Sequence, residues 1–262
     1  MMLPTLFLSH GAPYLAIVES PARDFLLGLR KLIDTPKAIL VVSAHWETAQ
    51  PEVNAVEINS TIHDFGGFGA ELHAMQYPAP GSSALAENVA ALLQEAGIET
   101  RIDQRRGLDH GAWVPLILVY PEAKIPVVQL SVQTHLGPAH HVALGRALSS
   151  LRTEGVLIIG SGSFTHNLHE FFNARGEAGK EPEWVTSFAD WFDGALTENR
   201  TKDLLCYREL APFAAKNHPT EEHLLPLYVA LGAAGDNTSV RRLHRSSDGG
   251  VLRLDAYEFH AA

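Results

Sequence analysis

Four histidines stand where a predicted strand ends or a predicted helix begins. In an open α/β sheet the carboxyl ends of the strands meet at one crevice, so side chains from distant parts of the chain can converge there. Imidazole is a common ligand of both zinc and non-haem iron in proteins. We therefore predict a metal site built from histidines. The four candidates are His10, His45, His166 and His223.

The local sequence supports each candidate. His10 and His45 directly follow apolar runs, where a side chain lies at the mouth of a sheet rather than within it. His166 follows a loop of glycines and serines, which lets a ligand approach the backbone closely. A phosphate-binding loop is the alternative there, but the spacing and the lysine of a P-loop are missing. His223 lies in the predicted first turn of a helix, whose dipole favours a neutral and ligating ring.

Two further histidines are candidates for other roles. His110 stands beside Asp109 in a polar turn, where an adjacent carboxylate can orient the ring for proton transfer. A local hydrogen bond within the turn is the alternative. His63 lies in an aromatic, Gly-rich loop, residues 62–69, and is a candidate for contact with a substrate.

Length and composition predict one ordinary globular domain, residues 1–262. The chain has 46% hydrophobic and 19% charged residues, enough apolar material for a large core. Its formal net charge of −10 and the lack of a Lys/Arg cluster argue against nucleic acid as a partner. A small-molecule partner is therefore expected.

The residue types available restrict the metal ligands. Cys206 is the only cysteine, which excludes a disulfide within the chain and a thiolate metal cluster, so the ligands must be His, Asp or Glu. No HExxH motif occurs, so a standard zincin is not indicated. The first residues lack the features of a signal peptide, and no run approaches the roughly 20 apolar residues of a membrane helix. We expect a cytoplasmic protein with no membrane partner.

Strand and helix patterns alternate along most of the chain. This alternation predicts an α/β fold with a mostly parallel or mixed central sheet and helices on both faces. Near the end, a turn at residues 248–250 followed by an alternating run predicts an antiparallel hairpin at the sheet edge, near residues 251–259. That edge is available for pairing between subunits, which leaves a homo-oligomer open. Predicted strands are 3–8, 38–43, 53–58, 125–132 and 156–159, and predicted helices are 22–33, 82–96, 138–151, 183–196 and 221–231.

Seven short strings, taken in order, resemble those of the class III extradiol ring-cleavage dioxygenases, in particular the 4,5-DOPA dioxygenase-like branch. The resemblance implies an α/β enzyme that opens small, DOPA-like catechols with dioxygen at a mononuclear non-haem Fe(II). Zinc is also found in the site of members of this branch. The strings span residues 8–13, 42–46, 61–68, 77–81, 109–113, 166–168 and 223–227.

The resemblance also implies roles for individual residues. His10, His45 and His223 would hold the metal, His166 would be a further ligand or the nearby base, and His110 would be the proton donor. Many relatives use two histidines and one carboxylate, and Glu222 is the carboxylate to consider if the third ligand is misplaced. A neutral third ligand leaves the metal more positive and shifts the preference toward zinc.

Several residues near these strings are candidates for substrate binding. Trp46, Phe65 and Tyr77, together with Phe68, can form aromatic walls for a planar ring, with core packing as the alternative. Asp64 can meet a substrate amine or make an Asx turn within its own loop.

Two other functions stay open on the residues alone. One is a zinc-dependent hydrolase, because histidines with an open position can activate a metal-bound water. The other is a non-catalytic protein that binds a metal or an aromatic ligand.

Overall fold

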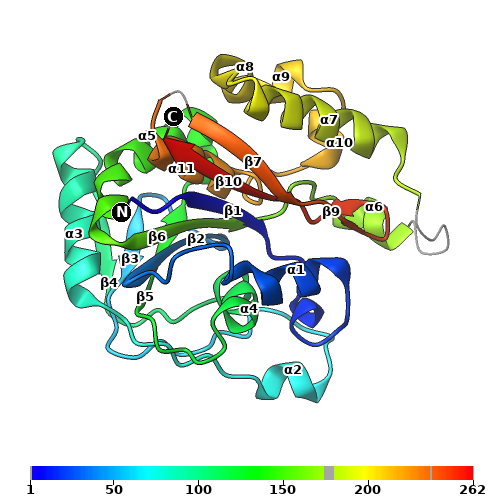
Figure 1. Ribbon diagram of the computed structural model, residues 1–262. Coiled ribbons are helices and arrows are strands. Elements are labelled where there is room, and N and C mark those ends of the chain that lie inside the picture. The colour runs from blue at the N-terminus through cyan, green and yellow to red at the C-terminus, as the bar shows by residue number, and fades with distance from the viewer. Residues whose placement is uncertain (1, 174–179, 237, 262) are drawn as a thin grey trace.

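A mixed sheet of eight strands forms the centre of the computed structural model, which describes residues 2–173, 180–236 and 238–261 (Figure 1). The strand order is β4-β3-β5-β2-β6-β1-β10-β7. The four central strands β5, β2, β6 and β1 are parallel to one another, and β10 and β7 extend the sheet in antiparallel fashion. The α/β prediction is therefore confirmed, with a mixed sheet. The strands are β1 Thr5–Ser9, β2 Ala38–Glu47, β3 Glu52–Asn54, β4 Arg101–Asp103, β5 Val127–Val132, β6 Val156–Gly162, β7 Thr238–His244 and β10 Ala256–Ala261.

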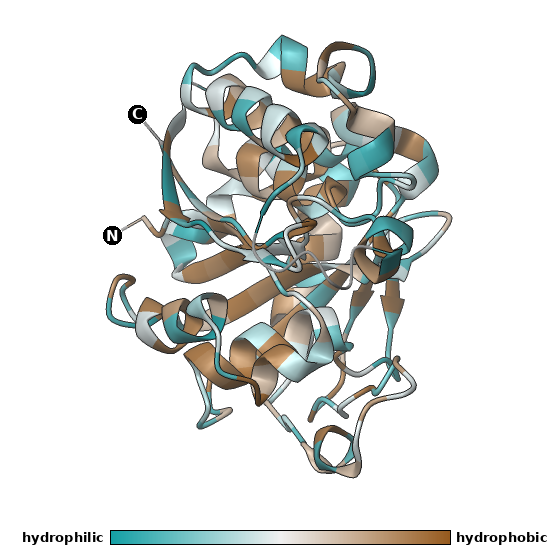
Figure 2. Ribbon diagram, turned by 90° about the vertical axis from the view of Figure 1, so that its right-hand side faces the viewer, coloured by the Kyte–Doolittle hydropathy of each residue, from teal (hydrophilic) through white to brown (hydrophobic). Residues whose placement is uncertain are grey.

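Helices cover both faces of this sheet. Helices α1 (Pro21–Leu29) and α4 (His110–Val119) lie on one side, and α5 (Gly137–Ala147) and α11 (Leu225–Ala234) lie on the other (Figure 1). The central strands are buried and largely apolar, as the brown stretches of the sheet in Figure 2 show. This is expected for parallel strands that are covered on both faces. Other helices are α2 Ala70–Ala74, α3 Ser83–Glu95, α6 Leu168–Asn173, α7 Glu183–Thr197, α8 Thr201–Leu205, α9 Tyr207–Leu210 and α10 Ala214–Asn217.

The C-terminal segment forms a hairpin, but not at the sheet edge that was predicted. Strands β8 (Ser247–Asp248) and β9 (Leu252–Arg253) pair across Gly249 and Gly250, which have φ values of +57° and +72°. The chain then enters β10, which lies between β1 and β7. The predicted edge at residues 251–259 is thus buried inside the sheet, and β7 is the edge strand. Charged side chains such as Arg241, which pairs with Glu258, suit an edge because they discourage further strand pairing.

Two of the differences from the predicted helices concern histidines. Helix α11 begins at Leu225, so His223 precedes the helix and does not lie in its first turn. Pro226 explains the boundary, because proline is favoured in the first turn of a helix, where its missing N–H costs no helical hydrogen bond. Helix α4 was not predicted, since it is apolar on all sides and contains Pro115; His110 is its first residue and Asp109 caps it.

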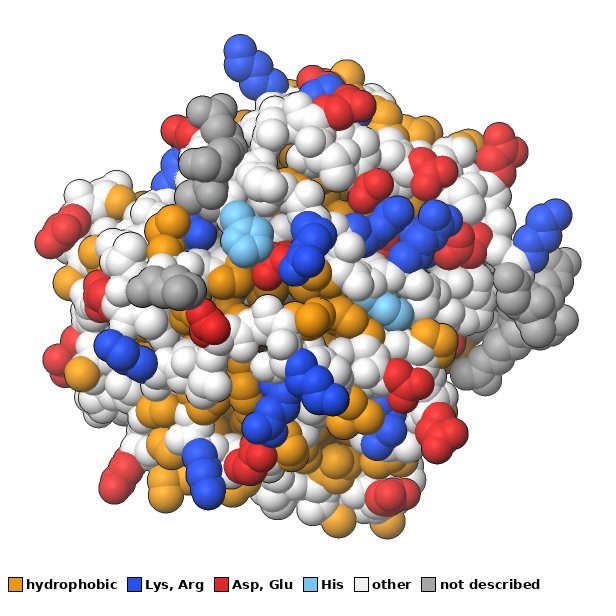
Figure 3. Space-filling model, in the orientation of Figure 1, with side chains coloured by type: hydrophobic (Ala, Val, Ile, Leu, Met, Phe, Trp, Pro, Cys, Tyr) orange, Lys and Arg blue, Asp and Glu red, His pale blue; other side chains and the backbone are white. Residues whose placement is uncertain are grey.

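Charged side chains of both signs are interspersed on one face of the molecule. On the face in Figure 3, Lys and Arg side chains alternate with Asp and Glu side chains. Within the described part of the chain, no helix is both long and apolar enough to cross a membrane.

Candidate metal centre

Three imidazole rings meet at the carboxyl ends of the central parallel strands. His10 directly follows β1, His45 lies in β2, and His223 lies two residues before α11. The Nε2 atoms of His10 and His45 are 3.0 Å apart, and those of His45 and His223 are 3.3 Å apart. Two nitrogens that bind one ion at about 2.1 Å are separated by about 3 Å. Both distances suit nitrogens that bind a single metal ion.

Two glycines of β6 let the His223 segment approach the sheet. A Cβ atom at Gly162 would lie 2.0 Å from the carbonyl oxygen of His223, and one at Gly160 would lie 2.1 Å from that of Pro226. The backbone N–H of Ser163 then donates to the His223 carbonyl at 2.9 Å. The Gly/Ser segment before His166 thus allows the segment that carries His223 to lie against the ends of the strands.

Hydrogen bonds determine which nitrogen of His10 carries the hydrogen. The Ser161 hydroxyl donates its only hydrogen to the carbonyl oxygen of Gly111. Its oxygen lies 3.1 Å from Nδ1 of His10, so that nitrogen must be the donor. Nε2 of His10 is left without a hydrogen and faces the other rings. The Gly111 carbonyl is available because its helical partner would be Pro115, which has no N–H.

Carboxylates lie near the Nδ1 atoms of the other two rings, where His10 has Ser161. Oε1 of Glu222 lies 2.8 Å from Nδ1 of His223, and Oδ2 of Asp64 lies 3.6 Å from Nδ1 of His45. At 2.8 Å the Glu222 carboxylate accepts the Nδ1 hydrogen of His223 and leaves its Nε2 bare, an arrangement typical of metal-binding histidines. The Asp64 carboxylate is at ion-pair distance from Nδ1 of His45 and makes no hydrogen bond to it. Glu222, considered above as an alternative ligand, thus contacts Nδ1 of His223, whereas Nε2 of the same ring faces His45. It also groups with His166 and His223, with donor atoms within 4.8 Å of one another.

Burial keeps these rings neutral. Loss of water around the charged form, reinforced by neighbouring histidines, lowers the pKa of His10 and His223 well below the usual value. The same causes lower the pKa of His45 to about 3. Neutral imidazoles with bare nitrogens repel one another at these distances and attract a cation. The donor set therefore fits a divalent metal, and either iron or zinc accepts such ligands.

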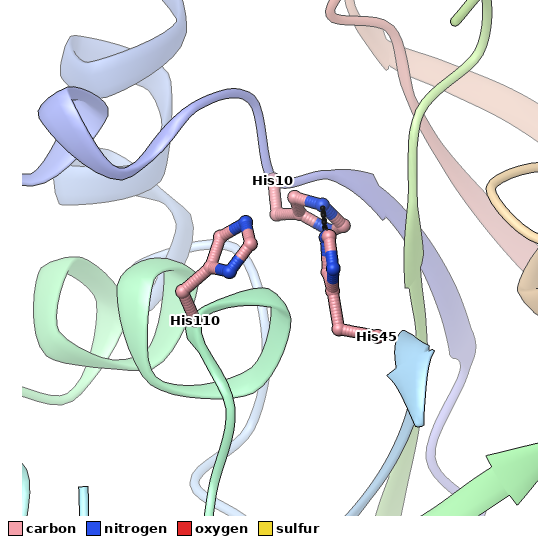
Figure 4. A group of neighbouring side chains, drawn as sticks. All are labelled: His10, His45 and His110. Carbon is pink, nitrogen blue, oxygen red and sulfur yellow. Dashed lines mark hydrogen bonds between the residues drawn. The ribbon is translucent and has the colours of Figure 1, made fainter. Parts of the chain in front are cut away.

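The two candidate proton-transfer histidines flank this group. The ring of His166 stacks on that of His223, with centroids 3.5 Å apart, and the ring of His110 lies 3.9 Å from that of His45. Figure 4 shows His110 at the start of α4, facing His10 and His45. His10, His45 and His110 also have donor atoms within 4.8 Å of one another. All five histidines line one cavity of about 360 Å³.

The carboxylate that contacts the His110 ring is not the neighbouring Asp109. Asp109 caps α4 through Ala112, accepts the Ser43 hydroxyl at 2.7 Å and pairs with Arg106 at 3.0 Å. Asp64 takes this place instead, with Oδ1 3.0 Å from Nδ1 of His110. The helix requires a cap at residue 109, which turns that side chain away from the ring.

The predicted substrate-binding residues separate into two groups. Phe65 and Phe68 line the cavity, whereas the other predicted substrate-binding residues do not. Trp46 is buried under the guanidinium of Arg106, 4.6 Å from its ring centre, and the Tyr77 hydroxyl donates to the Tyr120 carbonyl at 3.0 Å. His63 Nε2 lies 3.0 Å from the Met75 carbonyl oxygen, and Asp64 lies behind His45 and His110.

Sequence reasoning missed part of the cavity wall. Helix α6 contributes three apolar residues at helical spacing, and the C-terminal hairpin contributes one. Apolar residues on a short helix look like ordinary packing residues, and only the fold brings them over the histidines. The missed lining residues include Tyr14, Ser163, Leu168, Phe171, Phe172 and Leu252.

Comparisons with known proteins agree with this site. Residues 4–251 match the family model described as the catalytic LigB subunit of aromatic ring-opening dioxygenase. The chain is 49% identical to a 4,5-DOPA dioxygenase extradiol of Beta vulgaris, over 97% of this chain and 96% of that protein. It is 40% identical to the protein of the same name in Escherichia coli strain K12, over 88% of this chain and 85% of that protein.

The fold has a close counterpart among solved structures. The crystal structure of an uncharacterized protein from Escherichia coli K12 superposes with a TM-score of 0.80 and 33% sequence identity, covering 98% of this chain and 99% of that one. The matching family and relatives are ring-opening dioxygenases by name, which implies a metal, a catechol-type substrate and dioxygen. The chain belongs to the LigB family, the class III extradiol dioxygenases that open aromatic rings.

Proposed function

We propose that His10, His45 and His223 hold one Fe(II) ion and that this centre cleaves the ring of a DOPA-like catechol with dioxygen. The observation that carries the proposal is the convergence of three Nε2 atoms at 3.0 and 3.3 Å, with the Nδ1 atoms turned toward Ser161, Asp64 and Glu222. When bound, the metal supplies the charge that lowers the pKa of a catechol hydroxyl and the place where ring and dioxygen meet. The same ligands suit zinc, which would occupy the site without the redox chemistry.

His166 is proposed as the group that accepts the proton of a catechol hydroxyl. Burial lowers the pKa of its imidazole to about 4, so the ring is neutral near pH 7 and has a free lone pair. Its parallel contact with the His223 ring, at 3.5 Å, holds it at the edge of the metal site. This position is compatible with the other role considered for His166, that of a fourth ligand.

His110 is proposed as the group that returns a proton during ring opening. Oδ1 of Asp64 lies 3.0 Å from Nδ1 of His110, and Nε2 is the nitrogen that would exchange a proton with the substrate. The Asp64 carboxylate also compensates the positive charge that the ring carries as an acid. His110 lines the cavity, as this role requires.

The substrate class follows from the relatives and from the cavity. The relatives from Beta vulgaris and Escherichia coli are named for 4,5-DOPA, and we extend a DOPA-like catechol to this chain. Phe65 and Phe68 provide flat apolar surface beside the histidines, which suits a planar ring.

The test is anaerobic reconstitution of the metal-free protein with Fe(II), followed by L-DOPA or simpler catechols and air. We expect ring-opened product with one dioxygen consumed per catechol, and loss of both activity and bound iron in His45→Ala. The matched control His135→Ala, an exposed histidine outside the cavity, should keep both. One bound metal per chain with no oxygen uptake for any catechol would overturn the proposal and favour a zinc hydrolase or a binding protein.

A further inference from the structure

The segment that follows the metal ligand His10 forms a further part of the cavity wall. Residues 10–14 all line the cavity, and the last of them, Tyr14, belongs to the short 3₁₀ helix η1 (Pro13–Ala16). The hydroxyl of Tyr14 donates to Oδ2 of Asp248 in the C-terminal hairpin. A carboxylate of the hairpin therefore contacts a side chain of the cavity wall.

The pairing of β8 with β9 determines which face of the hairpin Asp248 occupies. Asp248 is paired with Leu252, and Ser247 is paired with Arg253. Directly opposed residues of an antiparallel pair have their side chains on the same face of the sheet. Leu252 lines the cavity, so Asp248 lies on the face of the hairpin that is turned toward the cavity. Its hydrogen bond to Tyr14 agrees with this placement.

The arginines of this segment pair with other carboxylates. Arg253, on the opposite face of the hairpin, lies 2.8 Å from Asp255, and Arg245 lies 3.7 Å from Glu181. Among the residues that the structure describes, no Lys, Arg or His nitrogen lies within 4.0 Å of the half-buried Asp248 carboxylate. A carboxylate offers about four lone-pair positions, so acceptor capacity is left beside the bond from the Tyr14 hydroxyl.

A row of aromatic rings extends from the histidines to this carboxylate. The ring of Phe65 lies 5.8 Å from that of His110, and the ring of Phe68 lies 5.3 Å from that of Phe65. Tyr14 continues the row, with its ring 6.2 Å from that of Phe68. The faces of aromatic rings carry negative potential and attract cations. The wall near Asp248 thus combines a carboxylate with aromatic rings, which is a combination that suits an ammonium group.

We propose that Asp248, oriented by the Tyr14 hydroxyl, binds the ammonium group on the side chain of a DOPA-like catechol, together with the rings of Tyr14 and Phe68. The proposal deepens the function proposed above and rests on it for the position of the catechol ring. Asp64, the carboxylate that the sequence suggested for a substrate amine, is engaged with two histidines of the metal site. A hydrogen bond between two charged groups is about twice as strong as a neutral one. Catechols with an amine on the side chain are therefore the preferred substrate class.

The first test compares catechols that differ in the ammonium group, on the iron-loaded enzyme. L-DOPA is compared with 3-(3,4-dihydroxyphenyl)propionate, and dopamine is compared with 4-propylcatechol, which has a methyl group in place of the ammonium. We expect kcat/KM to be about tenfold or more higher for the ammonium member of each pair, as is typical of a hydrogen bond to a charged group. Equal or higher kcat/KM for the compounds without an ammonium group would overturn the subsite.

The second test removes the charge of Asp248. In Asp248→Asn the ratio of kcat/KM for L-DOPA to that for the propionate should fall about tenfold. Differences in folding or iron content cancel, because both substrates are measured on one preparation. Tyr14→Phe keeps the ring but releases the carboxylate, so the ratio should fall less. Asp34→Asn, at an exposed carboxylate outside the cavity, is the matched control and should leave the ratio unchanged. An unchanged ratio in Asp248→Asn would contradict the proposal.

Binding without turnover separates this proposal from the proposed function. Calorimetric titration of the zinc-loaded protein, without dioxygen, should give a dissociation constant about tenfold lower for dopamine than for 4-propylcatechol, and Asp248→Asn should lose this difference. Such a result without turnover on iron would refute the dioxygenase chemistry and keep the subsite. Turnover of L-DOPA with the same substrate ratios in the unmodified enzyme and in Asp248→Asn would keep the chemistry and refute the subsite.

Discussion

Oδ1 of Asp64 lies 3.0 Å from Nδ1 of His110 and accepts the backbone N–H of the same residue at 3.0 Å, while Oδ2 lies 3.6 Å from Nδ1 of His45. One carboxylate thus connects a candidate metal ligand with the candidate proton donor. Burial alone would raise the pKa of Asp64, but hydrogen bonds from His110 lower it to about 2, so the group is charged near pH 7.

Replacing this carboxylate should reduce catalysis more than metal binding. We expect Asp64→Asn to lower kcat about 10- to 100-fold, because the neutral amide no longer compensates a charged His110 ring. Iron content should stay near one per chain, since three histidines remain. Asp236→Asn, which changes an exposed ion pair with Arg146, is the control and should leave kcat unchanged. A kcat near that of the unmodified enzyme in Asp64→Asn would refute this role.

Ser161 should determine metal affinity through His10. In Ser161→Ala, Nδ1 of His10 loses its acceptor and the Gly111 carbonyl loses its donor. The ring is then free to change tautomer or to rotate, so we expect metal affinity to fall 10- to 100-fold in a competition with a chelator. Ser150→Ala, at an exposed serine, provides the comparison. Unchanged affinity would show that Ser161 does not orient the ligand.

Much of this architecture follows from local sequence, and the exceptions have physical causes. Apolar runs that end in a histidine predict His10 and His45 at the sheet mouth because strand length and direction are local properties. The Asp64 contact with His110 is different, since it depends on the path of a loop with no regular structure. Helix α4 escapes prediction because it is apolar all round and contains Pro115, so it has no helical periodicity to detect.

The lining from α6 could not be predicted for a related reason. Leu168 and Phe172 are apolar residues at helical spacing, a pattern that usually indicates packing against a core. They reach the cavity because Asn167 and the turn at Gly249 hold the helix there. Asn167 donates to the carbonyl of Lys216, 49 residues away in sequence, and Gly249 of the C-terminal hairpin contacts Phe171. Hydrophobic pattern determines which face is apolar, but not what that face covers.

Gly162 should be required for both the fold and the metal site. A methyl group there would lie 2.0 Å from the His223 carbonyl oxygen, which is backbone and must move as a whole. We expect Gly162→Ala to lower the free energy of unfolding by about 2 kcal/mol and to reduce bound metal. Gly28→Ala is the matched control: it lies in α1 with nothing near its Cβ position and should raise stability by about 0.5–1 kcal/mol. Equal stabilities for the two variants, measured by denaturant unfolding, would contradict the argument.

His141 should make the fold sensitive to acid. Its Nδ1 lies 2.7 Å from the Gly137 carbonyl oxygen, and its Nε2 accepts the backbone N–H of Gln133 at 3.2 Å, so the buried ring has no place for a second hydrogen. Burial lowers its pKa to about 4 from a usual value of about 6.5. Between these values the unfolded chain binds the extra proton and the folded chain does not, so stability is lost as the pH falls from about 6.5 to 4.

The size of this effect can be isolated by comparison with a variant. Between pH 7 and pH 4 the free energy of unfolding should fall in both proteins. The fall should be about 3 kcal/mol smaller in His141→Gln than in the unmodified protein. Other buried histidines contribute with the same sign in both proteins and cancel in the difference. Parallel stability curves for His141→Gln and the unmodified protein would mean that the ring is not held neutral by these two bonds.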